Sequence, residues 1–183
     1  LIKNGKFEVS GRKLLPLKKN KIRIKIKAVG ICASDIPRAY DNGAYNYPLV
    51  MGHEMTGEIF ESHLKEFKIG ERAVIFPLIP CKKCKYCIEK KYNHCTNYSY
   101  YGSREDGGYA NYIDVYPWNI LKIEKKISFL DSFALEPSAV ALNTINTLFQ
   151  DKPKKKEKIL VLGSGFIGLL IINLLKIKYK KLN

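Results

Sequence analysis

The sequence predicts a mainly β fold with some helix, which changes to the start of an α/β unit towards its C-terminal end. Two observations support this prediction. Up to Phe133, several short strand-like stretches are joined by glycine-containing turns, which is typical of a β-barrel-like domain. After Phe133, apolar residues recur at helical spacing, and a second apolar segment then runs into closely spaced glycines. We therefore expect a first domain over residues 1–150, and only the first strand and helix of a second domain over residues 151–183.

The strands of the first domain are predicted from alternation and composition. Over residues 22–28, isoleucine and alanine alternate with arginine and lysine, a period of two that indicates a half-buried strand. Further strand-like stretches cover residues 55–60, 73–76 and 109–115. A helix is predicted to begin near Pro137, since proline is favoured in the first turn and Ala141, Ile145 and Leu148 follow at helical spacing.

The second domain is predicted from a glycine pattern. Residues 158–162 have strand character and run into Gly163, Gly165 and Gly168, after which an apolar helical pattern begins. A strand, G-x-G-x-x-G and a helix in this order form the start of a dinucleotide-binding Rossmann unit. The glycines allow a tight turn, so that a pyrophosphate can sit at the helix N-terminus. We expect NAD or NADP as cofactor; the residue that distinguishes them normally lies about 20 residues further on, at or beyond Asn183.

Four of the five cysteines are grouped in one segment. They are Cys81, Cys84, Cys87 and Cys95, with the spacing C-x2-C-x2-C-x7-C. Four thiolates grouped in this way can close a tetrahedral Zn²⁺ site with no open position, as in structural zinc sites. Neighbouring lysines favour the thiolate form. The alternative is a pair of disulfides, which the absence of an export signal disfavours, and we expect a cytoplasmic protein.

The chain is strongly basic, with 32 Lys and Arg against 17 Asp and Glu and a net charge of +15. Together with the cysteines, this charge suggests a zinc-binding nucleic-acid module as an alternative function. The basic residues are, however, scattered rather than gathered into one stripe, which disfavours a nucleic-acid partner. The uncharged run over residues 159–175 is slightly short for a membrane span and contains three glycines. We expect neither a nucleic-acid nor a membrane partner.

Several motifs occur in the order of one enzyme family. They are Gly30-Ile-Cys-Ala-Ser-Asp35, Gly52-His-Glu54, Gly70-Glu-Arg72, the four-cysteine segment, Asp106-Gly-Gly108 and the glycine pattern. With these motifs, nearly the whole chain resembles the zinc-dependent medium-chain alcohol and polyol dehydrogenases. The resemblance implies a GroES-like β-barrel catalytic domain followed by a Rossmann domain. It also implies hydride transfer from a polyol or polyol phosphate to NAD(P), two zinc ions per chain and a homo-oligomer, a dimer or tetramer.

The resemblance assigns a second, catalytic zinc to Cys32, His53 and Glu136, with Glu54 as a carboxylate that binds the metal or replaces another ligand. Thiolate, imidazole and carboxylate are all competent zinc ligands, and three protein ligands leave a position for a substrate hydroxyl. A catalytically inactive dehydrogenase fragment is the remaining alternative.

Three further residues next to Cys32 take roles from the resemblance. Asp35 is expected to orient His53, and Ser34 to hydrogen-bond the substrate oxygen and start the proton's exit. Many relatives carry a histidine three residues beyond that serine, whereas this chain has Pro37, so the later proton path is open and water is an alternative. Arg38 is a candidate phosphate contact or a surface arginine.

Overall fold

The computed structural model describes residues 1–149 and 158–179. The chain forms two compact units, residues 1–133 and 134–183, which we describe separately. The division falls before the boundary expected after residue 150, because helix α4 (Leu135–Leu148) packs against helix α5 (Phe166–Lys178). The domain boundary expected from sequence stays a prediction.

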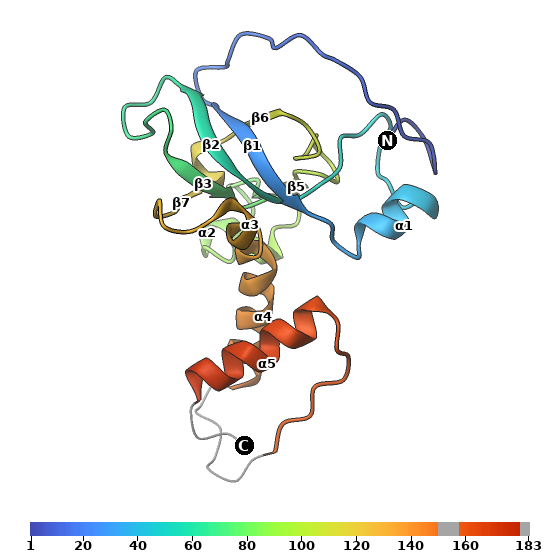
Figure 1. The fold of residues 1–183 in the computed structure, drawn as a ribbon, viewed down its shortest axis with the longest axis vertical. Helices are drawn as coiled ribbons and strands as arrows, with labels where there is room; N and C mark the ends of the chain where they lie inside the picture. Colours follow the sequence, from blue (N-terminus) through green and yellow to red (C-terminus); the bar gives the residue numbers. More distant parts are fainter. Residues whose placement is uncertain (150–157, 180–183) are drawn as a thin grey trace. The chain divides into compact units, whose positions relative to one another are not determined.

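The first unit is built on a five-stranded antiparallel sheet with the order β6-β1-β2-β3-β7 (Figure 1). Its strands are β1 (Ile22–Gly30), β2 (Glu54–Ser62), β3 (Arg72–Ile75), β6 (Tyr112–Val115) and β7 (Ile120–Lys122). The predicted mainly β fold is confirmed. The strand expected over residues 109–115 is shorter than predicted, since regular pairing begins at Tyr112.

The core lies on one face of this sheet. It consists of Ile22, Ile24, Met55, Ile59, Ile75, Tyr101, Ile113 and Val115. Alternation along β1 predicts Ile22 and Ile24 in the core but does not predict the burial of Arg23, which is 5% exposed. The Arg23 guanidinium is satisfied by two hydrogen bonds to Asp114, of 2.8 and 2.9 Å, and one of 2.9 Å to Glu61. A buried charge is tolerated where such partners exist.

The pairing of β1 with β2 brings two distant sequence motifs together. Gly30, the last residue of β1, is paired with Glu54, the first residue of β2. In an antiparallel pair the end of one strand lies beside the start of the other. The loop after β1 leads into helix α1 (Asp35–Tyr40), and His53 immediately precedes β2. This register therefore positions Cys32 next to His53.

The cysteine segment is an excursion between two short paired strands, β4 (Leu78–Ile79) and β5 (Ser99–Tyr100). Within it lie the short helix α2 (Lys85–Ile88) and the 3-10 turn η1 (Tyr92–His94). A second 3-10 turn, η2 (Pro117–Asn119), precedes β7, and helix α3 (Phe129–Ser132) closes the first unit. Closing the excursion with a strand pair fixes both ends of the cysteine segment.

The second unit contains α4 and α5. The helix predicted near Pro137 is present, with Pro137 in its first turn. The strand predicted over residues 158–162 is not formed, because a strand needs a neighbour to pair with and the described residues offer none there. Among the described residues, none of the helices combines the length and the apolar character needed to cross a membrane.

Candidate metal centres

Cys32, His53 and Glu54 form one group of potential ligands. One ligand atom from each lies within 4.8 Å of those of the other two. His53 is 6% exposed and Glu54 4%, whereas Cys32 is only partly buried. The three donors come from the adjoining ends of β1 and β2, so the register of the sheet holds them together. A thiol, an imidazole and a carboxylate at this separation are a donor set suited to zinc.

Gly30 provides the space that Glu54 occupies. A Cβ atom at position 30 would lie 1.9 Å from Glu54 Oε2 and 2.8 Å from the Phe133 ring. Any side chain at this position would therefore displace the carboxylate from Cys32 and His53. The glycine of the first motif is required by the packing of the site.

Asp35 lies beside the imidazole of His53. Its Oδ1 is 3.5 Å from His53 Nδ1 and accepts a 2.9 Å hydrogen bond from Arg38. Its Oδ2 accepts bonds from the Cys32 N–H at 3.2 Å and from the Tyr109 hydroxyl at 3.1 Å. Burial by itself would raise the pKa of Asp35, but His53, Tyr109 and the Cys32 N–H together lower it. Asp35 is thus a fixed carboxylate in the position expected for orienting His53.

The electrostatics of the group favour a cation. Burial would lower the pKa of His53, but Asp35 and Cys32 outweigh it and raise this pKa to about 9. Burial also raises the pKa of Glu54. His53 Nδ1 is buried and has no partner of hydrogen-bonding geometry among the described residues. Acidic groups thus surround a proton on His53, and a divalent cation bound there would replace that proton.

Tyr109 is a residue of this site that the sequence did not single out. Its hydroxyl reaches Asp35, and its ring lies against Gly52, where an added Cβ would be 2.7 Å from the ring. Gly52 also has a φ of +90°, which disfavours other residues. The only signal in the sequence was the position of Tyr109 directly after the Asp106-Gly-Gly108 turn.

The structure places the remaining predicted residues in different settings. Ser34 is exposed at the N-cap of α1, and its side chain caps no backbone N–H. The Arg38 side chain is 14% exposed and paired with Asp35, so its role as a phosphate contact stays a prediction. Glu136 lies in the first turn of α4, in the second unit, and its role as a zinc ligand also stays a prediction.

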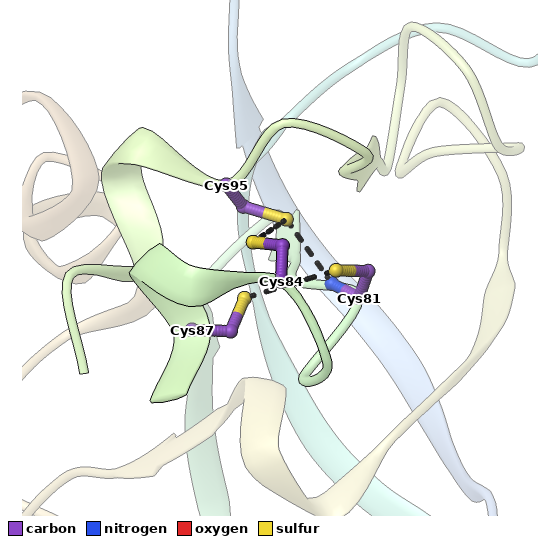
Figure 2. A group of neighbouring side chains, drawn as sticks. All are labelled: Cys81, Cys84, Cys87 and Cys95. Atoms are coloured by element: carbon purple, nitrogen blue, oxygen red, sulfur yellow. Dashed lines mark hydrogen bonds between the residues drawn. The ribbon is translucent and has the colours of Figure 1, made fainter. Parts of the chain in front are cut away.

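The four cysteines of the excursion converge on one point, as Figure 2 shows. They are free thiols, and their sulfur atoms all lie within 4.8 Å of one another. Cys81 Sγ is 3.9 Å from Cys87 Sγ, and Cys84 Sγ is 4.0 Å from Cys95 Sγ. Zn–S bonds of about 2.3 Å in a tetrahedron put the sulfurs about 3.8 Å apart. The spacing therefore fits a four-sulfur metal site and is far longer than a disulfide bond.

Backbone N–H groups of the excursion point at its sulfurs. The Cys81 N–H donates to Cys95 Sγ over 3.3 Å. Hydrogen bonds from the backbone of Thr96 and Cys87 lower the pKa of Cys84 to about 6, whereas burial raises the pKa of Cys87. Such donors stabilise thiolates, the form that binds metal.

The single tryptophan of the chain lies against this cysteine lobe, residues 81–95. The ring of Trp118 is 4.7 Å from that of Tyr92, and Lys82 Nζ is 5.9 Å from the Trp118 ring centre. Tyr92 and Lys82 both lie between cysteines of the lobe. Trp118 is therefore a built-in reporter of the conformation of the lobe.

The predicted cofactor glycines lie at the start of α5, where Gly163 and Gly165 precede the helix and Gly168 lies in its first turn. Gly163 has a φ of +108°, and Gly165 is the N-cap of the helix. A Cβ at Gly168 would lie 2.1 Å from the Gly163 carbonyl oxygen. Backbone conformation thus favours glycine at position 163 and packing requires it at position 168, whereas a Cβ at Gly165 would meet nothing within 4 Å. Their role in cofactor binding stays a prediction.

Comparison with known proteins identifies the family. Residues 18–125 match the alcohol dehydrogenase GroES-like domain. The chain belongs to this family, and its mainly β first unit is the GroES-like domain expected from the sequence. The likeness to zinc-dependent medium-chain dehydrogenases is thereby confirmed.

Particular relatives extend this result. The chain is 36% identical over 155 residues to galactitol 1-phosphate 5-dehydrogenase of Escherichia coli K12. The match covers 84% of this chain and 44% of the relative. It is 33% identical to L-galactonate-5-dehydrogenase of the same strain, over 82% of this chain and 44% of that protein. The chain thus spans about half the length of the curated relatives it matches.

Solved structures agree with this. The crystal structure of E. coli galactitol-1-phosphate dehydrogenase superposes with a TM-score of 0.86 at 33% identity, over 93% of this chain and 49% of that one. The E. coli CFT073 alcohol dehydrogenase rspB, crystallised with NADH, gives a TM-score of 0.88 at 31% identity, over 99% of this chain and 53% of that one.

Proposed function

We propose that the protein is a zinc-dependent oxidoreductase that transfers a hydride from a hydroxyl of a polyol or polyol phosphate to NAD(P). The observation that carries the proposal is the convergence of Cys32, His53 and Glu54 at the adjoining ends of β1 and β2. A buried imidazole whose Nδ1 faces Asp35, with a thiol and a second carboxylate within reach, is an arrangement that suits a metal ion bound by the histidine. Of the relatives named above, one is a dehydrogenase of galactitol 1-phosphate, a polyol phosphate, and the other is a dehydrogenase of L-galactonate.

In this proposal Cys32, His53 and one or both of Glu54 and Glu136 hold the catalytic ion. Zinc bound there would act as a Lewis acid that lowers the pKa of the substrate hydroxyl. Asp35 holds the His53 ring in place, since its other oxygen is fixed by two donors. Ser34, with an exposed hydroxyl that caps nothing, accepts the proton of the substrate hydroxyl and passes it to water. Pro37 offers no group for a further relay.

The four-cysteine site has a different role. Its four sulfurs leave no open position for a substrate, so a second zinc there would brace the excursion between β4 and β5. Gly163, Gly165 and Gly168 would receive the pyrophosphate of NAD or NADP at the N-terminus of α5. We further propose a homo-oligomer in the cytoplasm.

The substrate that the similarity favours is galactitol 1-phosphate or a close polyol phosphate. The support is 36% identity to a galactitol 1-phosphate 5-dehydrogenase over 44% of that protein. Arg38 stands next to Asp35 with an Nε that has no partner among the described residues, which keeps it as the proposed phosphate contact.

The test is an assay of reduced nicotinamide formation by the whole protein with galactitol 1-phosphate, galactitol and L-galactonate, each with NAD and with NADP. We expect the phosphate ester to be oxidised fastest. Cys32→Ser should abolish the activity and remove one zinc of two, whereas Gly11→Ala, at a site with nothing within 4 Å, should change neither. Full activity of Cys32→Ser would contradict the proposal.

A further inference from the structure

We propose that Tyr109 is a positioning residue of the catalytic metal site: its hydroxyl fixes Asp35 and thereby the orientation of His53. The inference rests on the proposed metal site at Cys32, His53 and Glu54. Tyr109 lies in a distant part of the chain, the turn before β6, and joins the residues that orient His53 for metal binding.

Tyr109 contacts both the loop that carries His53 and the groups at the end of β1 that face His53. Its N–H donates to the Met51 carbonyl over 2.9 Å, and its ring lies against Gly52, so it contacts the loop that carries His53. Its hydroxyl oxygen is 3.1 Å from Asp35 Oδ2 and 3.2 Å from the Gly30 carbonyl oxygen. One phenol proton is therefore shared between the end of β1 and the carboxylate next to His53.

The two oxygens of Asp35 have separate tasks. Oδ1 faces His53 Nδ1 and accepts a hydrogen bond from Arg38. Oδ2 accepts hydrogen bonds from the Cys32 N–H and the Tyr109 hydroxyl. The two donors on Oδ2 set the plane of the carboxylate and so keep Oδ1 facing the imidazole. Removing the hydroxyl leaves Oδ2 with the Cys32 N–H as its single donor, so the plane of the carboxylate is held less tightly.

A change in the orientation of Asp35 should alter the affinity of the site for its metal ion. His53 Nδ1 lies 3.5 Å from Asp35 Oδ1 and has no other partner among the described residues, so Asp35 is the group that orients this side of the ring. Residues that orient a metal-binding histidine change metal affinity when they are altered. Tyr109 acts one contact further out and should have a smaller effect than Asp35.

The effect of the hydroxyl can be separated from that of the ring. Tyr109→Phe removes the donor and keeps the ring that packs on Gly52. Tyr112→Phe is a matched control, because it also removes a tyrosine hydroxyl and the Tyr112 ring packs on Phe60, with ring centres 4.8 Å apart. Asp35→Asn shows how far zinc affinity falls when the carboxylate itself is altered.

The experiment measures zinc affinity of the chain by competition with a coloured chelator, while Trp118 emission follows the cysteine lobe. We expect Tyr109→Phe to weaken zinc binding at the Cys32 site about 3- to 10-fold and to leave the lobe unchanged, with no change in Tyr112→Phe. In the background of Asp35→Asn, the same substitution should cost much less, because the two residues act through one contact.

The outcomes separate the two proposals. If the wild-type chain binds zinc in the lobe alone, the proposed metal site fails. If it binds two ions and Tyr109→Phe leaves both affinities unchanged, or weakens both equally, the inference on Tyr109 is overturned and the metal site stands. Full additivity of the two substitutions would also overturn it.

Discussion

Replacing Gly30 by alanine should damage the metal site more than it damages the fold. The new Cβ would lie 1.9 Å from Glu54 Oε2, whereas ordinary van der Waals contact begins at 3.4 Å. The oxygen would therefore have to withdraw by about 1.5 Å, and metal–ligand distances tolerate only about 0.2 Å. Glu54 Oε2 is the end of a flexible side chain, and the Phe133 ring, 2.8 Å from the new Cβ, must also shift, so the fold should accommodate the change at a cost of about 1–3 kcal/mol in the free energy of unfolding.

The assay combines urea unfolding with zinc titration of Gly30→Ala, using Gly11→Ala as a control with nothing near its new Cβ. We expect zinc affinity at the Cys32 site to fall at least about 10-fold, while the cysteine lobe keeps its zinc. The control should match the wild type in both measurements. If Gly30→Ala binds zinc at both sites as the wild type does, then Glu54 does not belong to the site, and the reasoning from its position is wrong.

Two further predictions concern the metal-free protein and the lobe. The His53 pKa of about 9 lies above its ordinary value of 6.5, so its charged form stabilises the metal-free fold below about pH 6.5, and this contribution is lost as the pH rises through about 9. Urea unfolding of the zinc-free chain should show a loss on the order of 1–3 kcal/mol over this range, and His53→Gln should flatten the profile; a profile as steep in the variant would contradict the assignment. Removal of metal by a chelator should change the emission of Trp118, because Tyr92 and Lys82 of the lobe contact it. Cys81→Ser should show the changed emission without chelator and Cys32→Ser should keep the wild-type response; an identical response in both would show that Trp118 does not report on the lobe.

The features that the sequence predicts well are local ones. The cysteine spacing places four sulfurs within reach of one ion because the chain between them is short, and the structure has them together. The alternation over residues 22–28 predicts strand β1, and the spacing after Pro137 predicts helix α4. In each case the signal and its structural consequence lie within a few turns of chain.

The features that the sequence does not predict depend on register and on partners. The pairing of Gly30 with Glu54, which joins two motifs, is fixed by the whole sheet. Arg23 is buried because Asp114 and Glu61 lie on the strands beside it. The contact of Tyr109 with Asp35 spans 74 positions and has no local signal.

The strand expected over residues 158–162 is predicted by the sequence but is not formed. Its composition favours a strand, yet composition cannot supply the neighbouring strand that pairing requires. Arg38 and Asp35 lie three positions apart on α1, a spacing at which helix side chains meet, so the sequence does carry a signal for their ion pair.

X-ray absorption at the zinc edge tests the central claim, that the chain holds two chemically different zinc sites, most directly. With two zinc ions bound, one has four sulfur neighbours from the lobe and the other has one from Cys32, so the account predicts a mean of about 2.5 sulfurs per zinc, with nitrogen and oxygen making up the rest. A mean of about four sulfurs per zinc would show that zinc occupies the lobe alone, and would contradict the catalytic site.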